Sequence, residues 1–264
     1  MYIKFDSETI WANDGSWEHA YIESEIDLNG RLNAIEEQGD RQMNLYRDSK
    51  ALNRAYTLVL RLGASRTKSI PELMNWWEDL HTKNGGERTV ERVMTSGRVL
   101  QLTAVPEAPQ WSAVGTRYAT VTQVYTAALP LWKESAEQSD SAAYTAAVAT
   151  TCAFNNEGTV PTWVRLNYAG AVTDPWVGYS TDWEIEWDLD IPLNDELDVN
   201  TRTPATVWYR PNVGADYTAY GYRTNTTSFR RAKLPVGSGT LDMVAAAGTG
   251  VLTVYWYNYF EAFV

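Results

Sequence analysis

The sequence has very few of the residues on which disulfides, zinc sites and histidine-based catalysis depend. It contains one cysteine, Cys152, and two histidines, His19 and His81. A single cysteine excludes an intrachain disulfide and a cysteine-rich zinc site. Two histidines are too few for a histidine-rich metal site and provide few candidates for the histidine of a Ser-His-Asp triad. No P-loop, nucleophile elbow or dinucleotide-binding glycine motif is present, so we expect no enzyme, no metal and no cofactor.

Long apolar runs and an excess of positive charge are also absent. No stretch of about 18 apolar residues predicts a membrane span. The first residues, MYIKFDSETI, show neither the basic nor the apolar region of a signal peptide. The formal net charge is −11, which disfavours nucleic acid as a bound partner, because phosphate neutralisation needs basic side chains.

Tryptophan and tyrosine, by contrast, are abundant, with 12 Trp and 16 Tyr against 5 Phe. These side chains combine a large apolar body with a polar group and concentrate at interfaces. In an acidic chain they predict either extended contact surfaces, for protein or sugar, or an aromatic sandwich core. The candidate contact residues are Trp176, Tyr179, Tyr217 and Tyr220.

The segment DWEIEWDLDI, residues 182–191, alternates strictly between acidic and large apolar side chains. Successive side chains of a strand point to opposite faces, so the pattern predicts a strand with one buried and one wet face. We expect Trp183 and Trp187 in the core of an antiparallel sheet, since such sheets commonly keep one face in water. The wet face carries a row of carboxylates, which we call the acidic row: Asp182, Glu184, Glu186, Asp188 and Asp190.

Several uses of the acidic row are open. The simplest is a solvated strand face, and a basic partner or a calcium ion are alternatives, although a flat strand does not wrap a metal. Glu184 and Glu186 are two positions apart, roughly 7 Å. That separation falls within the range of an inverting glycosidase pair. A row of equivalent carboxylates, however, offers no distinct acid and base.

The first half of the chain predicts strands, among them residues 56–62, and one helix at 70–83. Ser69 as N-cap and Glu72 three residues later have the spacing of a capping box. His81, near the end of the helix, is expected to stabilise its C-terminus as a cation. The polar residues 31–55 predict a long hairpin or a mobile arm. The apolar stripe of the helix consists of Leu73, Trp76, Trp77 and Leu80.

A polar segment rich in small residues, KESAEQSDSAA, marks a domain boundary. We predict an N-terminal domain at 1–133, a linker at 134–143 and a C-terminal domain at 144–264. In the C-terminal domain, short apolar segments recur about every 8–12 residues between turn residues, which is typical of a β-sandwich. The predicted strands are 145–153, 162–168, 182–191, 205–210, 226–230, 239–246 and 250–260.

The order of several phrases resembles the distal tail proteins of bacteriophages with long, non-contractile tails. In the first half these are IPELMNWWEDLH (70–81), RVLQLTAVPEAPQW (98–111) and YTAALPLWKES (125–135). The second half continues with CAFNNEGTVP (152–161), DPW (174–176), FRRAKLPVG (229–237) and the aromatic closing segment 252–259. The likeness covers nearly the whole chain.

This resemblance implies a mainly β, two-domain fold: a β-rich N-terminal domain with one packed helix, then a galectin-like antiparallel sandwich. It also implies a structural protein of the virion, assembled in the host cytoplasm and placed at the distal end of the tail. Family members form a hexameric ring that joins the tail tube protein and the end of the tape-measure protein to the tip and receptor-binding proteins. DNA passes through the ring without specific binding, and no catalytic residue is carried over.

A ring of this kind predicts that the 31–55 segment is an arm that clasps the adjacent subunit, with Glu36, Glu37, Asp40 and Arg41 as candidate contacts. The alternative function is a lectin-like carbohydrate-binding adhesion module that uses the exposed aromatic side chains. A ring-forming protein and a monomeric lectin differ in oligomeric state, which makes that state the discriminating measurement.

Overall fold

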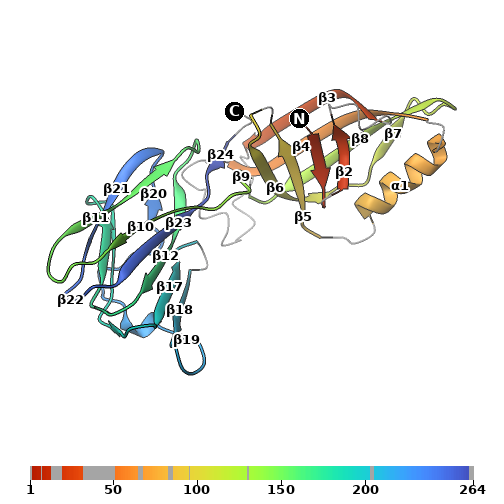
Figure 1. Ribbon diagram of the computed structural model, residues 1–264. Coiled ribbons are helices and arrows are strands. Elements are labelled where there is room, and N and C mark those ends of the chain that lie inside the picture. Colours follow the sequence, from red (N-terminus) through yellow and green to blue (C-terminus); the bar gives the residue numbers. More distant parts are fainter. Residues whose placement is uncertain are drawn as a thin grey trace. The chain divides into compact units, whose positions relative to one another are not determined.

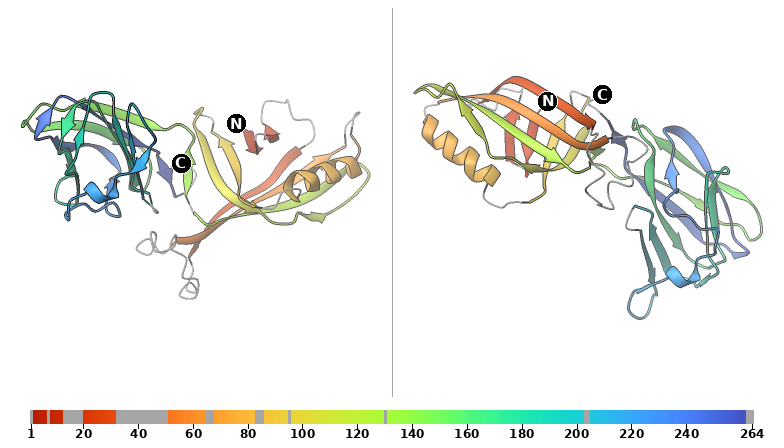
Figure 2. Two further views of the ribbon diagram at one scale, coloured as in Figure 1. Left: turned by 90° about the horizontal axis from the view of Figure 1, so that it is seen from below. Right: turned by 180° about the vertical axis from the view of Figure 1, so that it is seen from behind.

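The computed structural model describes residues 2–6, 8–12, 20–31, 51–64, 68–82, 86–94, 96–129, 131–202 and 205–261. The chain forms two compact units (Figures 1 and 2). Unit 1 comprises Met1–Ser135 with Phe260–Val264, and unit 2 comprises Ala136–Tyr259. Both are built mainly from antiparallel strands, which confirms the predicted mainly β, two-domain fold class. The galectin-like character of unit 2 stays a prediction.

Unit 1 is organised around a ten-stranded sheet whose main path runs β2-β1-β5-β6-β8-β4-β3. Helix α1 (Ile70–Thr82) packs on this sheet (Figures 1 and 2). Outside the main path, β7 pairs with β8, and β9 pairs with β6 and with β24. The strands are β1 (Tyr2–Phe5), β2 (Glu8–Ala12), β3 (Ala20–Arg31), β4 (Ala51–Gly63), β5 (Arg88–Val93), β6 (Val99–Pro106), β7 (Gln110–Ser112), β8 (Tyr118–Ala127), β9 (Trp132–Glu134) and β24 (Tyr259–Phe260).

Strands β3 and β4 form a long antiparallel pair at one end of the strand path. Their register runs from Ala20 opposite Leu62 to Arg31 opposite Ala51. The two ends of the polar segment, Arg31 and residues 51–55, therefore belong to this strand pair. The candidate contacts Glu36, Glu37, Asp40 and Arg41 lie outside the described residues, as does His19.

The start of α1 agrees with the predicted capping box. Ser69 donates hydrogen bonds from its backbone N–H and from its hydroxyl to Glu72 Oε2, both at 2.7 Å. The backbone hydrogen bond from Ser69 lowers the pKa of Glu72. The Leu73 N–H donates to the Ser69 carbonyl at 3.0 Å, which closes the first helical turn. These bonds satisfy donors that a helix otherwise leaves without partners at its N-terminus.

The apolar stripe of α1 packs on the sheet as expected. Leu73 and Trp77 are buried, and Trp76 and Leu80 are partly buried against the same core. The Trp77 indole donates to Gln123 Oε1 on β8 at 3.1 Å. Gln123 is fully buried, and its own amide donates to two backbone carbonyls. The two buried polar groups that link helix and sheet, the Trp77 indole and the Gln123 amide, therefore both have hydrogen-bond partners.

The predicted role of His81 as a C-terminal cation is wrong. The His81 side chain is buried between the rings of Phe5 and Trp77, each with its centroid 4.5 Å away. Burial lowers the pKa of His81 from 6.5 to about 4, so the ring is neutral near pH 7. The helix stripe therefore includes this histidine as a core residue.

Unit 2 contains two main sheets. One is seven-stranded, with the path β10-β23-β12-β17-β18-β19 and β20 beside β12, and the other is four-stranded, in the order β11-β21-β14-β15. A small sheet, β16-β13-β22, accompanies them. The elements are β10 (Gln138–Ala143), β11 (Thr150–Asn156), β12 (Thr162–Ala169), β13 (Val172–Thr173), β14 (Trp176–Tyr179), β15 (Trp183–Glu186), β16 (Asp190–Ile191), β17 (Glu196–Asn200), β18 (Thr206–Arg210), β19 (Tyr217–Thr218), η2 (Tyr220–Tyr222), β20 (Lys233–Leu234), β21 (Gly237–Val244), β22 (Ala247–Gly248) and β23 (Val251–Trp256).

One hydrophobic core joins the two main sheets of unit 2. The buried side chains come from the inner faces of both, for example Cys152 and Ile185 from the four-stranded sheet and Leu166 and Val199 from the seven-stranded sheet. Cys152 is a small buried residue, as the sequence predicts. This two-layer packing of antiparallel sheets confirms a sandwich.

Residues 182–191 alternate between buried and more exposed side chains as predicted, but they form two strands instead of one. Trp183, Ile185 and Trp187 are buried, whereas Asp182 and Asp188 are exposed. Strand β15 belongs to the four-stranded sheet and β16 to the small sheet. The alternation specified which side chains face inward and did not specify a single pairing partner.

Two other predictions, one of a linker and one of a strand, need correction. The predicted linker 134–143 is wrong for Gln138–Ala143, which is strand β10 and pairs with β23 from Gln138 opposite Trp256 to Ala143 opposite Val251. The predicted strand 226–230 is wrong, because that segment makes turns. Among the described residues, no helix has the length and hydropathy needed to cross a membrane.

Candidate functional site

The outer face of the four-stranded sheet carries a fixed tryptophan. Strands β14 and β15 place Gly178 opposite Glu184. The Trp176 ring lies over Gly178, since a Cβ built on that glycine would be 2.8 Å from Trp176 Cζ2. The Trp176 indole donates to Glu184 Oε2 at 3.1 Å. Trp176 is therefore half-buried. Its indole N–H is bonded to Glu184, and its ring occupies the space that the missing side chain of Gly178 leaves.

Substituting Gly178 by alanine should displace this tryptophan. The new methyl group would also approach the Trp183 carbonyl oxygen at 3.1 Å. We expect a loss of about 1–3 kcal/mol in the free energy of unfolding of unit 2, as for overpacked cores. A change in the indole N–H signal of Trp176 should accompany it in the NMR spectrum.

Gly221→Ala is the matched control for this substitution. Nothing lies within 4 Å of a Cβ built on Gly221, so its effect should stay within about 0.5 kcal/mol, as for ordinary surface changes. An unshifted Trp176 signal in Gly178→Ala would contradict the packing described for Trp176.

Two hydroxyl groups contact Glu186 in the acidic row. Glu186 Oε2 accepts hydrogen bonds from the hydroxyls of Thr224, at 3.0 Å, and Thr226, at 3.2 Å. The backbone of the same segment runs along the edge of β15: the Thr224 N–H donates to the Glu186 carbonyl and the Ser228 N–H to the Glu184 carbonyl. The chain thus covers this edge with its own 224–228 segment.

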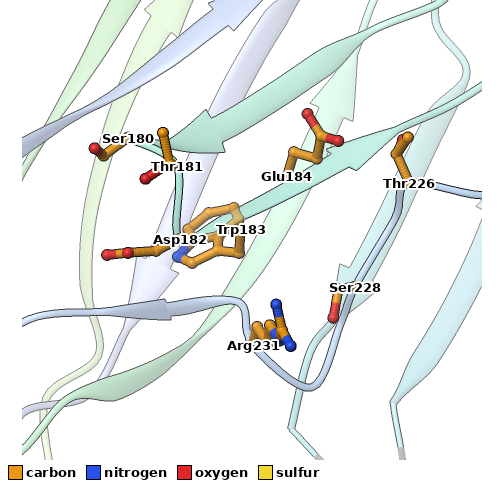
Figure 3. A pocket seen from close by; sticks show the side chains of 8 residues that line it. All are labelled: Ser180, Thr181, Asp182, Trp183, Glu184, Thr226, Ser228 and Arg231. Atoms are coloured by element: carbon orange, nitrogen blue, oxygen red, sulfur yellow. The ribbon is translucent and has the colours of Figure 1, made fainter.

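A polar cavity of about 320 Å³ lies where this segment meets the turn between β14 and β15 (Figure 3). The turn is closed by the Asp182 N–H, which donates to the Tyr179 carbonyl at 3.0 Å, and Ser180 adopts a left-handed backbone with φ of 49°. The cavity is lined by Ser180, Thr181, Asp182, Trp183, Glu184, Thr226, Ser228 and Arg231. We call it the turn cavity.

Opposite charges line the turn cavity without pairing. Asp182 and Glu184 come from one side and Arg231 from the other (Figure 3). Within the part of the chain that the structure describes, Arg231 forms no ion pair with either carboxylate. Among the same residues, no group of three His, Cys, Asp or Glu side chains is placed to hold a metal ion.

The structure does not bring the four candidate aromatic residues together. Trp176 lies on the outer face of its sheet, whereas Tyr179 packs edge-on against Phe154 in the core. Tyr217 is 43% exposed and stacks on Tyr209. The fourth, Tyr220, packs against the core and donates its hydroxyl to the Ala205 carbonyl.

The two carboxylates of the turn cavity belong to the acidic row predicted from the sequence, whereas no sequence pattern predicted its other polar residues. Thr226, Ser228 and Arg231 are more than 40 positions from Asp182, and no pattern in the sequence links them to it. Only the tertiary pairing of the 224–228 segment with β15 places them there. The candidate glycosidase pair, Glu184 and Glu186, shares a face as expected, with each carboxylate bonded to different partners.

Comparison with solved structures shows a likeness over the whole chain. The Dit protein (gp 19.1) of phage SPP1, described as a paradigm of the hub adsorption apparatus in phages that infect Gram-positive bacteria, matches with a TM-score of 0.62 and 10% identity over 98% of each chain. The baseplate of phage P2 in its activated conformation with Ca matches 79% of this chain and 80% of that chain, with a TM-score of 0.42 and 8% identity. No protein-family model and no curated protein matches. The likeness to the SPP1 protein shows a shared fold.

Proposed function

We propose that the chain is a distal tail protein, a structural hub of a long, non-contractile bacteriophage tail, without enzymatic activity. The observation that carries the proposal is the likeness to the SPP1 Dit protein, which covers 98% of both chains and therefore includes both units in the same order. Fold alone does not define function. The sequence resemblance to the same family, found in phrases spread over both units, points the same way.

In this proposal six copies form a closed ring at the distal end of the tail. The ring joins the tail tube and the end of the tape-measure protein to the tip and receptor-binding proteins, after assembly in the host cytoplasm. A cyclic ring needs two different surfaces that meet head to tail. Strand β3 offers one of them: it has 12 residues and, among the described residues, pairs only with β4. A free strand edge of that length can pair with a neighbouring chain.

The acid excess suits a channel through which DNA slides. The chain has 33 acidic against 22 basic residues. Like charge prevents the phosphate neutralisation on which non-specific DNA binding depends. This charge balance is compatible with a DNA channel and does not assign particular carboxylates to its wall.

The mass of the protein in solution tests this proposal. Light scattering at several concentrations should give six copies of the 29.7 kDa chain, about 178 kDa, and negative-stain images should show rings with an open centre. A stable monomer at every concentration would contradict a ring that forms from this chain alone.

A deletion variant tests the proposed arm. Replacing residues 32–50 by a two-glycine turn joins β3 to β4 directly, since Arg31 and Ala51 are opposite each other at the end of the pair. We expect this variant to be monomeric while unit 2 stays folded. A ring that survives the deletion would remove Glu36, Glu37, Asp40 and Arg41 from the subunit contacts.

A further inference from the structure

We propose that the turn cavity binds a short, neutral saccharide. The inference starts from the chemistry of its lining: four hydroxyl side chains, two carboxylates, one guanidinium and one indole. Almost every lining side chain can donate or accept a hydrogen bond, and both kinds of group are present. Hydroxyl groups of a sugar each donate and accept, so a sugar can bond to both kinds at once.

The charges of the lining disfavour other ligand classes. An anion such as phosphate would meet the carboxylates of Asp182 and Glu184, and a cation would meet the guanidinium of Arg231. An apolar ligand would strip water from these polar groups without replacing their hydrogen bonds, which is costly. A neutral polyhydroxyl ligand avoids all three penalties.

The separation of the charges leaves room for that ligand. Arg231 is exposed and, among the described residues, has no ion-pair partner, although two carboxylates line the same cavity. A sugar hydroxyl can accept from the guanidinium while a neighbouring hydroxyl donates to a carboxylate. Hydrogen bonds to charged groups are the stronger kind. The ligand thus bridges groups that do not reach each other.

Hydrogen bonds within the walls of the cavity fix the positions of the residues that line it. The Trp176 indole holds Glu184 Oε2, which leaves the other carboxylate oxygen of Glu184 as an acceptor. Backbone bonds from Ser228 to the Glu184 carbonyl, at 3.2 Å, and from Arg231 to the Ser228 carbonyl, at 3.3 Å, fix the opposite wall. Groups placed before binding cost less to order when the ligand arrives.

The size and shape of the cavity limit the ligand. A volume of about 320 Å³ is near the lower end of small-molecule sites, roughly 300–1,000 Å³. Trp183 is 5% exposed, so it forms a wall and offers no broad stacking surface. We therefore expect a short saccharide, held mainly through its hydroxyls, with a Kd of about 1 mM.

Saturation-transfer NMR and calorimetric titration of the full chain test this inference. The probes are glucose, galactose and N-acetylglucosamine, with maltotriose, lactose and chitotriose as oligomers, and with glycine and inorganic phosphate as charged controls. At least one sugar should receive saturation transfer at about 10 mM, well above the expected Kd, and glycine should not. Inorganic phosphate has no carbon-bound proton, so calorimetric titration follows it and should detect no binding. No transfer to any sugar, or binding of glycine or phosphate alone, would overturn the proposal.

Two pairs of variants locate the binding. Arg231→Ala and Asp182→Ala should each weaken sugar binding about tenfold, the effect of losing one hydrogen bond to a charged group. Arg230→Ala and Asp188→Ala are the matched controls, because both residues are exposed neighbours that do not line the cavity. Equal losses in the cavity and control variants would overturn the assignment. Sugar binding is measured on the chain in any oligomeric state, so its failure would leave the ring proposal standing.

Discussion

Replacing Trp187 by alanine is expected to lower the free energy of unfolding of unit 2 by about 3–5 kcal/mol, the usual cost of truncating a buried large aromatic. Trp187 is fully buried in the core shared by the two main sheets, and its ring centroid is 6.0 Å from that of Phe229. Its backbone N–H donates to the Pro175 carbonyl at 3.1 Å. The truncated side chain would leave a cavity where the chain leaves β15.

Urea titration with NMR detection would resolve this effect. The methyl signals of Val177 and Ile185 report unit 2 alone, since both residues are buried in its core. Trp208→Ala is the matched control: Trp208 lies in the same unit and is 45% exposed, so its truncation should cost less than about 1 kcal/mol. A loss below about 1 kcal/mol for Trp187→Ala would place its side chain outside the core.

The sequence predicted those parts of the fold that depend on local signals. Helix α1 follows from its capping box and its apolar stripe, both contained within residues 69–80. The alternation of residues 182–191 predicted which side chains are buried. It could not predict that β15 pairs with β14 while β16 pairs with β13, because a period of two specifies a face and leaves the partner open.

The errors have tertiary causes. Gln138–Ala143 has the composition of a linker, yet its backbone pairs with β23 at the end of the strand path, where most of its side chains stay in water. An edge strand of this kind needs few apolar residues. The 226–230 segment is rich in threonine, which favours strands. In this segment the backbone forms turns instead of pairing with a strand; for example, the Thr227 N–H donates to the Thr224 carbonyl at 3.3 Å.

In the turn cavity, too, the sequence pattern leaves the tertiary arrangement open, and with it the function. Its two carboxylates belong to a pattern that is visible in the sequence, but a row of acids is compatible with water, a cation or a partner. Arg231 changes the interpretation, because a guanidinium that lines the same cavity as the carboxylates favours a neutral hydrogen-bonding ligand over a cation. Only the fold brings that arginine to β15.

Acid is expected to destabilise unit 1 through His81. The Trp77 carbonyl can only accept a hydrogen bond, so His81 Nδ1, 2.8 Å away, carries the proton. In the neutral ring His81 Nε2 then accepts from the Tyr125 hydroxyl, also at 2.8 Å. Protonation would bury a charge and convert Nε2 into a donor. Burial is the main cause of the lowered pKa, and the nearby Arg88 lowers it further.

The sign and size of the effect follow from the two pKa values. The unfolded chain takes up a proton on His81 near pH 6.5, whereas the folded chain does so near pH 4. Between these values the unfolded state binds more protons, so stability is complete above about pH 6.5 and falls as the pH decreases toward 4. At about 1.4 kcal/mol per pKa unit the total loss is about 3 kcal/mol.

Comparing the wild type with His81→Gln isolates this contribution, because glutamine does not titrate and the carboxylates are common to both proteins. Urea titrations that follow the methyl signals of Ile70 and Leu73 report unit 1. The advantage of the wild type should shrink by about 3 kcal/mol from about pH 7 to about pH 4. Leu60→Val, a volume change in the same core, should show a constant difference over that range. A constant difference for His81→Gln as well would mean that His81 protonates equally in the folded and unfolded chain, and that its ring is not held neutral by the core.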